Sequence, residues 1–230
     1  MTAPAASAWT LSPLARQWAA NAGATDLPGH QQCVKLLQTG QIRNDKGGRW
    51  MQLTARQTIA LERCAFDWRA KMAPLGIISV VDQLGETGGV LQVKALGIVP
   101  LVNMPSSAEL TRGEAIRFLG ELPWAPDVIL SNHDLRWADT VDGAIVVSWG
   151  DIAVTLSVND AGLVDQVFAP DRPRAVKAGF VPTPWRGVYS DFRKIGGRTI
   201  PMKASASWTV DGTEAVYGNF SLTDWRLEGC

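Results

Sequence analysis

The sequence predicts an α+β fold: a strongly curved, mainly antiparallel β-sheet (a half-barrel) wrapped around two or three helices. Apolar and polar residues alternate with a period of two in several runs, which is typical of strands with one buried face. Turn residues separate these runs, and only two or three stretches interrupt them with helical spacing. Hairpin runs with few helices indicate α+β, and a sheet of about ten strands must curl or close.

Two regions are expected along the chain. Residues 1–26 form an N-terminal helical segment, with one helix over roughly residues 13–22. Residues 27–230 form a single curved-sheet domain, because no internal repeat, low-complexity tract or linker divides them. At 230 residues the chain has the length of one large β-rich domain.

The best marked helix is expected from about Ser107 to Leu122. Ser106 and Glu109 have the spacing of a capping box, and Pro123 and Pro126 end the helical pattern. This helix is predicted to lie inside the curve of the sheet.

The strand pattern is clearest over residues 200–210, and similar faces occur over 64–72, 152–158 and 51–61, the last interrupted by Gln57. Residues that tolerate positive φ separate the strands, as hairpins require. They are Asp45-Lys46-Gly47-Gly48, Asp142-Gly143, Gly150-Asp151, Asn159 to Gly162, Gly196-Gly197 and Asp211-Gly212. The proline- and arginine-rich stretch from Ala169 to Arg174 is expected to be a mobile loop.

Composition excludes several classes of protein. The chain has 22 basic and 22 acidic residues, so no charge excess points to nucleic acid. The three cysteines Cys33, Cys64 and Cys230 have no metal-type spacing, and we expect no disulfide. Residues 1–8 lack the pattern of a signal peptide, and no apolar run is long enough for a membrane span. A cytoplasmic location is predicted.

Familiar catalytic motifs are missing from the sequence. It contains no nucleophile elbow, phosphate-binding loop, dinucleotide fingerprint or zinc-protease helix. Its two histidines, His30 and His133, lie in turn-like contexts. No metal and no cofactor are therefore expected.

Several motifs resemble a family of uncharacterised bacterial proteins known as a domain of unknown function, over about residues 27–225. They are GQIR (40–43), RWMQLTA (49–55), FDWRA (66–70), RGEAIRFLGE (112–121) and PTPW (182–185). The resemblance implies a curved antiparallel sheet similar to the bacterial lipoprotein carriers, which hold acyl chains in the concave face. It implies no activity, because the family has none agreed.

Ten tryptophans against two tyrosines indicate either a bulky core or a roomy aromatic cavity. Five tryptophans adjoin an arginine, a pattern that could indicate stacking on nucleic-acid bases. Neighbours in a strand point to opposite faces, however, so a buried tryptophan beside a surface arginine is the better interpretation. Trp124 and Trp185 lie in proline-stiffened segments, as cavity walls or as loop anchors. The residues expected to contact a ligand are Trp68, Trp124, Trp185, Trp208, Phe66 and Phe118.

One strip of the expected helix carries Glu114, Arg117 and Glu121, spaced to pair along the helix. Either the strip is a solvated face with weak ion pairs, or it faces the hollow of the sheet. In the second case burial would raise the pKa of a carboxyl, Glu121 first, and make it an acid or base.

Three functions remain open. The first is binding of a hydrophobic or amphipathic small molecule in a tryptophan-lined cavity. The second is a cofactor-independent lyase, isomerase or hydrolase that uses Glu121, Glu114 and Arg117 on an apolar substrate. The third is a structural or partner-binding role. The ligand and the oligomeric state are not determined by the sequence.

Overall fold

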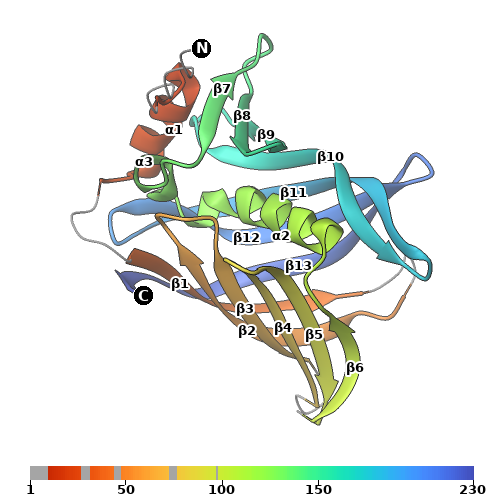
Figure 1. The fold of residues 1–230 in the computed structure, drawn as a ribbon. Helices are drawn as coiled ribbons and strands as arrows, with labels where there is room; N and C mark the ends of the chain where they lie inside the picture. Colours follow the sequence, from red (N-terminus) through yellow and green to blue (C-terminus); the bar gives the residue numbers. More distant parts are fainter. Residues whose placement is uncertain (1–9, 27–31, 44–47, 73–76, 97) are drawn as a thin grey trace, which may run out of the picture.

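One curved antiparallel sheet surrounds a helix in the computed structural model (Figure 1), which describes residues 10–26, 32–43, 48–72, 77–96 and 98–230. Thirteen strands among these residues form a single sheet in the order β6-β5-β4-β3-β2-β1-β13-β12-β11-β10-β9-β8-β7. This architecture confirms the α+β half-barrel. The strands are β1 (Gln32–Ile42), β2 (Met51–Ala60), β3 (Phe66–Met72), β4 (Ile78–Gly85), β5 (Gly88–Ala95), β6 (Val99–Met104), β7 (Arg136–Asp139), β8 (Ile145–Trp149), β9 (Ile152–Val158), β10 (Val164–Val176), β11 (Gly179–Ile195), β12 (Arg198–Val210) and β13 (Thr213–Gly229).

The first and last strands are neighbours in the middle of the sheet. β1 pairs with β2 on one side and with β13 on the other, with Gln32 opposite Gly229. Strands β2–β6 therefore form an early wing on one side of this pair, and β7–β12 form a late wing on the other. Each wing is built of hairpins between consecutive strands.

Helix α2 (Ala108–Gly120) lies in the concave face of the sheet (Figure 1). It contacts β4 and β5 of the early wing and β8, β9 and β10 of the late wing. Because these strands are far apart in the sheet order, the sheet must curl around the helix. Its interior side buries Ala115, Ile116, Phe118 and Leu119.

The start of α2 differs by one residue from the predicted capping pattern. Ser107 is the N-cap, and its side chain accepts a hydrogen bond from the Leu110 amide at 3.1 Å. Ser106 Oγ instead lies 3.4 Å from Thr111 Oγ1, and Glu109 is exposed. At the other end, the Tyr189 hydroxyl donates to the Gly120 carbonyl at 2.7 Å and fixes the helix against β11.

The predicted turns are confirmed where the structure describes them. Gly196 and Gly197 between β11 and β12, and Asp211 and Gly212 between β12 and β13, all have positive φ. The turn expected at 45–48 falls mainly on residues outside the described ranges.

The prediction of a mobile loop at 169–174 is wrong, because these residues belong to β10. The β10–β11 register shifts between Ala169 and Arg172. This bulge lets Pro170 interrupt the ladder without ending the strand.

The cysteine prediction is also wrong, because Cys33 and Cys230 form a disulfide with their Cα atoms 5.2 Å apart. A separation of 197 residues gave no sequence signal. The pairing of β1 with β13, which places Cys33 opposite Glu228, brings the two thiols together. Cys64 is free and buried.

The N-terminal helix α1 (Pro13–Ala22) is confirmed at its expected position, and Trp18 packs edge-on against Trp137 of β7 with ring centroids 6.1 Å apart. Two short helical segments, a 3₁₀ turn η1 (Leu122–Trp124) and α3 (Val128–Ser131), follow α2. In the described part of the chain, no helix has the length and apolar character needed to cross a membrane.

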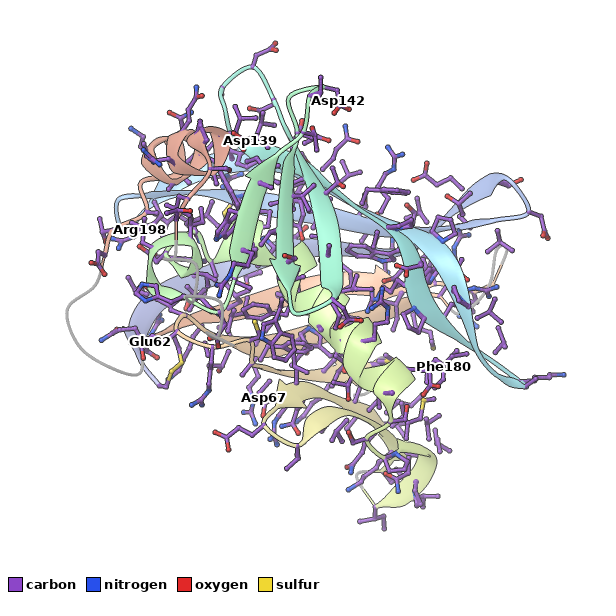
Figure 2. All side chains as sticks on the ribbon, turned by 45° about the horizontal axis from the view of Figure 1, so that its top comes forward. Glu62, Asp67, Asp139, Asp142, Phe180 and Arg198 are labelled. Carbon is purple, nitrogen blue, oxygen red and sulfur yellow. A yellow bond between two sulfur atoms is a disulfide. The ribbon has the colours of Figure 1, made fainter. Side chains whose placement is uncertain are left out.

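An ion pair with a fully buried carboxylate connects elements at this end of the molecule, and we call Thr25, Asp127 and Arg198 the Asp127 cluster. Asp127 has no exposed surface. Its oxygens accept hydrogen bonds from the Thr25 amide at 2.8 Å and from Arg198 Nη2 and Nε at 2.8 and 3.1 Å. Figure 2 shows Arg198 near α1, on the opposite side of the molecule from Phe180.

Candidate functional site

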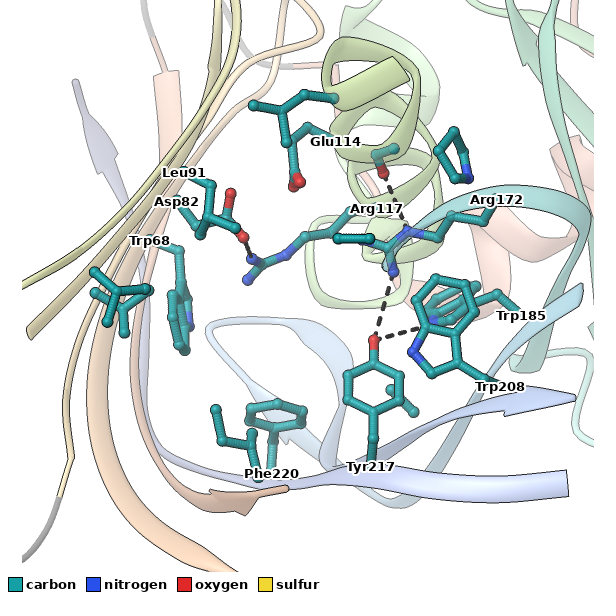
Figure 3. Close-up of a pocket in the computed structure, with 18 of the residues that line it drawn as sticks. Trp68, Asp82, Leu91, Glu114, Arg117, Arg172, Trp185, Trp208, Tyr217 and Phe220 are labelled. Carbon is teal, nitrogen blue, oxygen red and sulfur yellow. Dashed lines mark hydrogen bonds and ion pairs between the residues drawn. The ribbon is translucent and has the colours of Figure 1, made fainter. Parts of the chain in front are cut away.

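A cavity of about 670 Å³ lies between α2 and the two wings, within the size range of sites for small organic molecules. Its aliphatic wall comes mainly from the early wing. These residues are Met51, Met72, Ile78, Val80, Leu91 and Val93. Their inward direction follows from the period-two alternation of β2, β3, β4 and β5. Figure 3 shows charged side chains from α2, β4 and β10 projecting into the same space.

Four of the six aromatic residues expected at a ligand site line this cavity. Trp68 comes from β3, Trp124 from η1, Trp185 from β11 and Trp208 from β12. Trp124 is fixed by a hydrogen bond from its indole nitrogen to the Pro201 carbonyl at 3.0 Å. The proline-stiffened segment of Trp124 is thus both a core anchor and a cavity wall.

Phe66 and Phe118 are not among the described residues that line the cavity. Phe118 is 1% exposed and lies on the core side of α2. Phe66 packs behind the cavity wall, where the Arg117 guanidinium lies 4.8 Å from its ring centroid. The sequence pattern identified both as inward-facing but did not separate core from cavity.

The helix strip expected to carry charge is buried, so the solvated-face alternative is wrong. Glu114 is 5% and Glu121 9% exposed. Arg117 donates from Nε to Glu121 at 2.8 Å and from Nη1 to Asp82 of β4. Although desolvation lowers the pKa of Arg117, the carboxylates of Glu121 and Asp82 more than reverse this and raise it.

A relay of buried amides connects Glu121 to the tryptophan wall. Gln57 donates to Glu121, and Gln38 donates to Gln57 at 3.3 Å. The Trp68 indole in turn donates to Gln38 at 2.9 Å. Every member of this relay therefore has its position fixed by the next, and both Glu121 oxygens are hydrogen-bonded.

Glu114 differs from Glu121 because its carboxyl group is incompletely paired. Among the described residues, Glu114 Oε2 and Asp82 Oδ1 are buried oxygens without a hydrogen-bond partner. Burial raises the pKa of Glu114 well above its ordinary value, and the adjacent Asp82 adds to the rise, against the guanidinium groups of Arg172 and Arg117. Burial and the neighbouring Asp82 therefore favour the protonated form of Glu114.

A second buried guanidinium, Arg172, enters the cavity from β10. Its Nε donates to the Gly113 carbonyl at 3.2 Å, and its Nη1 lies 3.5 Å from the Tyr217 hydroxyl, which also accepts from the Trp185 indole at 3.0 Å. The guanidinium lies 5.0 and 5.4 Å from the ring centroids of Trp185 and Trp208. Arg172 thus packs against the aromatic side chains that form one wall of the cavity, and this wall faces Asp82 and Glu114 (Figure 3).

The formal charge of the cavity is set by seven acidic and basic side chains. They are four carboxyl groups (Asp82, Glu109, Glu114 and Glu121) and three guanidinium groups (Arg43, Arg117 and Arg172). With one proton on Glu114 the group is neutral, and without it the charge is −1. In the described residues, no three His, Cys, Asp or Glu side chains gather as a metal-binding group.

Sequence reasoning missed five polar residues that shape the cavity: Gln38, Gln57, Asp82, Arg172 and Tyr217. Gln57 and Asp82 had a usable signal, because each occupies an inward position between apolar neighbours of its strand, Ala55 and Ile59 or Val80 and Leu84. Arg172 had none, because the β10 bulge changes which residues point inward.

The fold and the cavity define a class: a single curved-sheet protein that encloses a helix and a partly charged, aromatic-walled hollow. The chain belongs to a family of unknown function (DUF6544), whose model matches residues 5–220. This confirms the membership that the sequence motifs indicated. A comparison with curated proteins found no match.

Three solved structures are similar to this chain. A LolA superfamily protein from Nitrosomonas europaea is 12% identical, covers 94% of both chains and has a TM-score of 0.46. A putative outer membrane lipoprotein-sorting protein domain from Vibrio parahaemolyticus is 8% identical over 94% of this chain and 91% of that one, with a TM-score of 0.49. A DUF1329 family protein from Desulfovibrio piger is 10% identical over 93% and 90%, with a TM-score of 0.48.

Proposed function

We propose that this protein binds a hydrophobic or amphipathic small molecule in the cavity between α2 and the sheet. The observation that carries the proposal is a hollow of about 670 Å³ with four tryptophans and an aliphatic wall on its surface. Burying apolar ligand surface contributes roughly 25 cal/mol per Å². A well-packed core would leave no comparable space.

The charged groups give the proposed ligand an orientation. They lie on α2, β4 and β10, whereas the aliphatic wall lies on the early wing. A molecule with an apolar body and one polar end satisfies both surfaces. A purely apolar ligand would leave buried oxygens of Glu114 and Asp82 without partners, which is costly.

The binding proposal is tested by titrating tryptophan emission and melting temperature with ten-carbon compounds that differ only in their head group. We expect saturable changes in both signals. An Ala204→Phe variant fills space at the cavity wall and should lower the affinity at least tenfold. Lys203→Phe, on the opposite face of the same strand, is the matched control and should bind normally.

Absence of any emission or melting change with all compounds would contradict the proposal. A structural or partner-binding role would then be favoured. Equal loss of affinity in Ala204→Phe and Lys203→Phe would show that the cavity is not the binding site.

A second candidate function, a cofactor-independent lyase, isomerase or hydrolase, is favoured by one observation. Glu114 is a buried carboxyl with a raised pKa beside Asp82, an arrangement suited to general acid catalysis. Here Glu114 would transfer the proton, and Arg117 with Glu121 would fix the electrostatic surroundings. Compounds that bind should then be converted to products detectable by mass spectrometry. Glu114→Gln should abolish conversion without abolishing binding, and lack of conversion by the unaltered protein would exclude this function for those compounds.

A further inference from the structure

The polar atoms left unpaired in the cavity are all of one kind. Among the described residues, its buried oxygens without a partner are Glu114 Oε2 and Asp82 Oδ1, and both are acceptors. The guanidinium groups of Arg117 and Arg172 already have hydrogen-bond acceptors. Arg117 donates to two carboxylates, and Arg172 donates to a carbonyl and a hydroxyl. When both carboxyl groups are ionised, these two oxygens therefore require a hydrogen-bond donor.

The charge of the site indicates which donor fits best. The seven acidic and basic side chains that line the cavity give a formal charge of −1 when all are ionised, and one proton on Glu114 restores neutrality. A net charge buried away from water is strongly unfavourable. A ligand that brings one positive charge can replace that proton and leave the site neutral, whereas an anionic ligand would add an uncompensated charge.

We propose that the ligand is a cationic amphiphile, an apolar chain ending in a protonated amine whose ammonium group binds between Glu114 and Asp82. This inference rests on the proposed binding function and adds the chemical class of the head group. The ammonium N–H groups donate to Glu114 Oε2 and Asp82 Oδ1, and the proton of Glu114 passes to solvent. No covalent bond changes, and up to one proton is released for each amine bound.

The groups that surround Glu114 decide the pH dependence of this exchange. Asp82 faces it from β4, Arg117 and Glu121 lie on α2 itself, and Arg172 faces it from β10. The Tyr217 hydroxyl is held beside Arg172. Because the amine displaces the proton of Glu114, its affinity should increase with pH by up to tenfold per unit while Glu114 is protonated in the free protein.

The experiment compares decylamine, decanol and decanoate by isothermal titration calorimetry between pH 6 and 9, in two buffers of different ionisation enthalpy. Alkylamines resemble lysine, with a pKa near ~10, and stay charged over most of this range. At pH 8 we expect decylamine to bind at least tenfold more tightly than decanol. Up to one proton should be released for each amine bound, with the largest release at the low end of the pH range. Decanol affinity should change little with pH.

A matched pair of variants isolates the carboxyl group. Glu114→Gln should lower decylamine affinity to the level of decanol and remove its pH dependence, while decanol still binds. Glu86→Gln, in the exposed turn between β4 and β5, should leave all affinities unchanged. If Glu114→Gln does not fold, the pH series on the unaltered protein decides.

The possible outcomes separate this inference from the proposed function. Equal affinity for decanol and decylamine, or tighter binding of decanoate, overturns the cationic head group but leaves the binding function intact. Failure of all three compounds to bind overturns the binding function and this inference together.

Discussion

Two charge clusters with buried carboxylates, the Asp127 cluster and the cavity group, differ in how completely their carboxylates are paired. In the Asp127 cluster, both carboxylate oxygens accept from Thr25 or Arg198. In the cavity, Glu114 and Asp82 each keep one buried oxygen without a partner among the described residues. The carboxylates of both clusters are buried, so burial of the carboxylates alone does not distinguish the clusters.

The difference separates stability from function. A buried ion pair with all its hydrogen bonds made fixes the elements that carry it, here the segment after α1, the start of α3 and the start of β12. Buried oxygens left unpaired weaken the folded state. Such oxygens have a function if they accept a hydrogen bond from a ligand or bind a transferred proton. The cavity, rather than the Asp127 cluster, is therefore the candidate site.

The largest expected effect comes from breaking the fully paired cluster. Asp127→Asn leaves the Arg198 guanidinium, whose side chain is 12% exposed, without its counter-charge and should lower the free energy of unfolding by about 3 kcal/mol. Urea denaturation measures this loss, and ligand affinity in the folded variant should be unchanged. A loss below ~1 kcal/mol, or an altered affinity, would remove the distinction between the two clusters.

A smaller change in the free energy of unfolding, an increase instead of a decrease, is expected when Glu114 in the cavity is replaced. The raised pKa of Glu114 means that the folded state keeps a proton that the unfolded chain loses above its ordinary value of 4.5. The free energy of unfolding should therefore fall, by about 1.4 kcal/mol per pH unit, between that value and the folded-state pKa. Glu114→Gln should remove this slope and be more stable than the unaltered protein at pH 8. Parallel stability curves from pH 5 to 8 would contradict the assignment.

The smallest effect is expected at an exposed ion pair on the outer side of β3. Asp67 accepts two hydrogen bonds from Arg69, and these lower its pKa, with a further contribution from Gln83. Its stabilisation is present above the ordinary pKa of 3.8 and is lost as the pH falls below it. Because the pair is exposed, Asp67→Asn should change the free energy of unfolding by less than about 1 kcal/mol. Thermal melting at pH 7 and pH 3 measures the change, and a larger loss would show that exposure does not weaken ion pairs here.

The sequence predicted the parts of the molecule that depend on local pattern. Alternation identified the strands and their inward faces, and the pairs Gly196-Gly197 and Asp211-Gly212 identified the β11–β12 and β12–β13 turns. The helix strip of Glu114, Arg117 and Glu121 was found, but the solvated and buried alternatives were separable only by the curl of the sheet. That curl depends on contacts between α2 and both wings, which no local pattern encodes.

The features that were missed are non-local. The Cys33–Cys230 bond depends on the pairing of the first and last strands, and Arg172 enters the cavity because of a bulge. The cytoplasmic location stays a prediction, and the disulfide argues against it, because such bonds are rare in reducing compartments. Alkylation of thiols in intact cells would decide, since a cytoplasmic protein should expose Cys33 and Cys230 to the reagent after denaturation.

The central position of β1 and β13 has a consequence for biosynthesis. The early wing and β1 are complete once residue 104 has been made, yet the free edge of β1 remains unpaired until β13, the last strand, is translated. Contacts of such long sequence separation form slowly, so the nascent chain carries two half-built sheets with open edges until synthesis ends. Such edges invite pairing with other chains, and premature termination before β13 would produce an aggregating polypeptide rather than a smaller functional one.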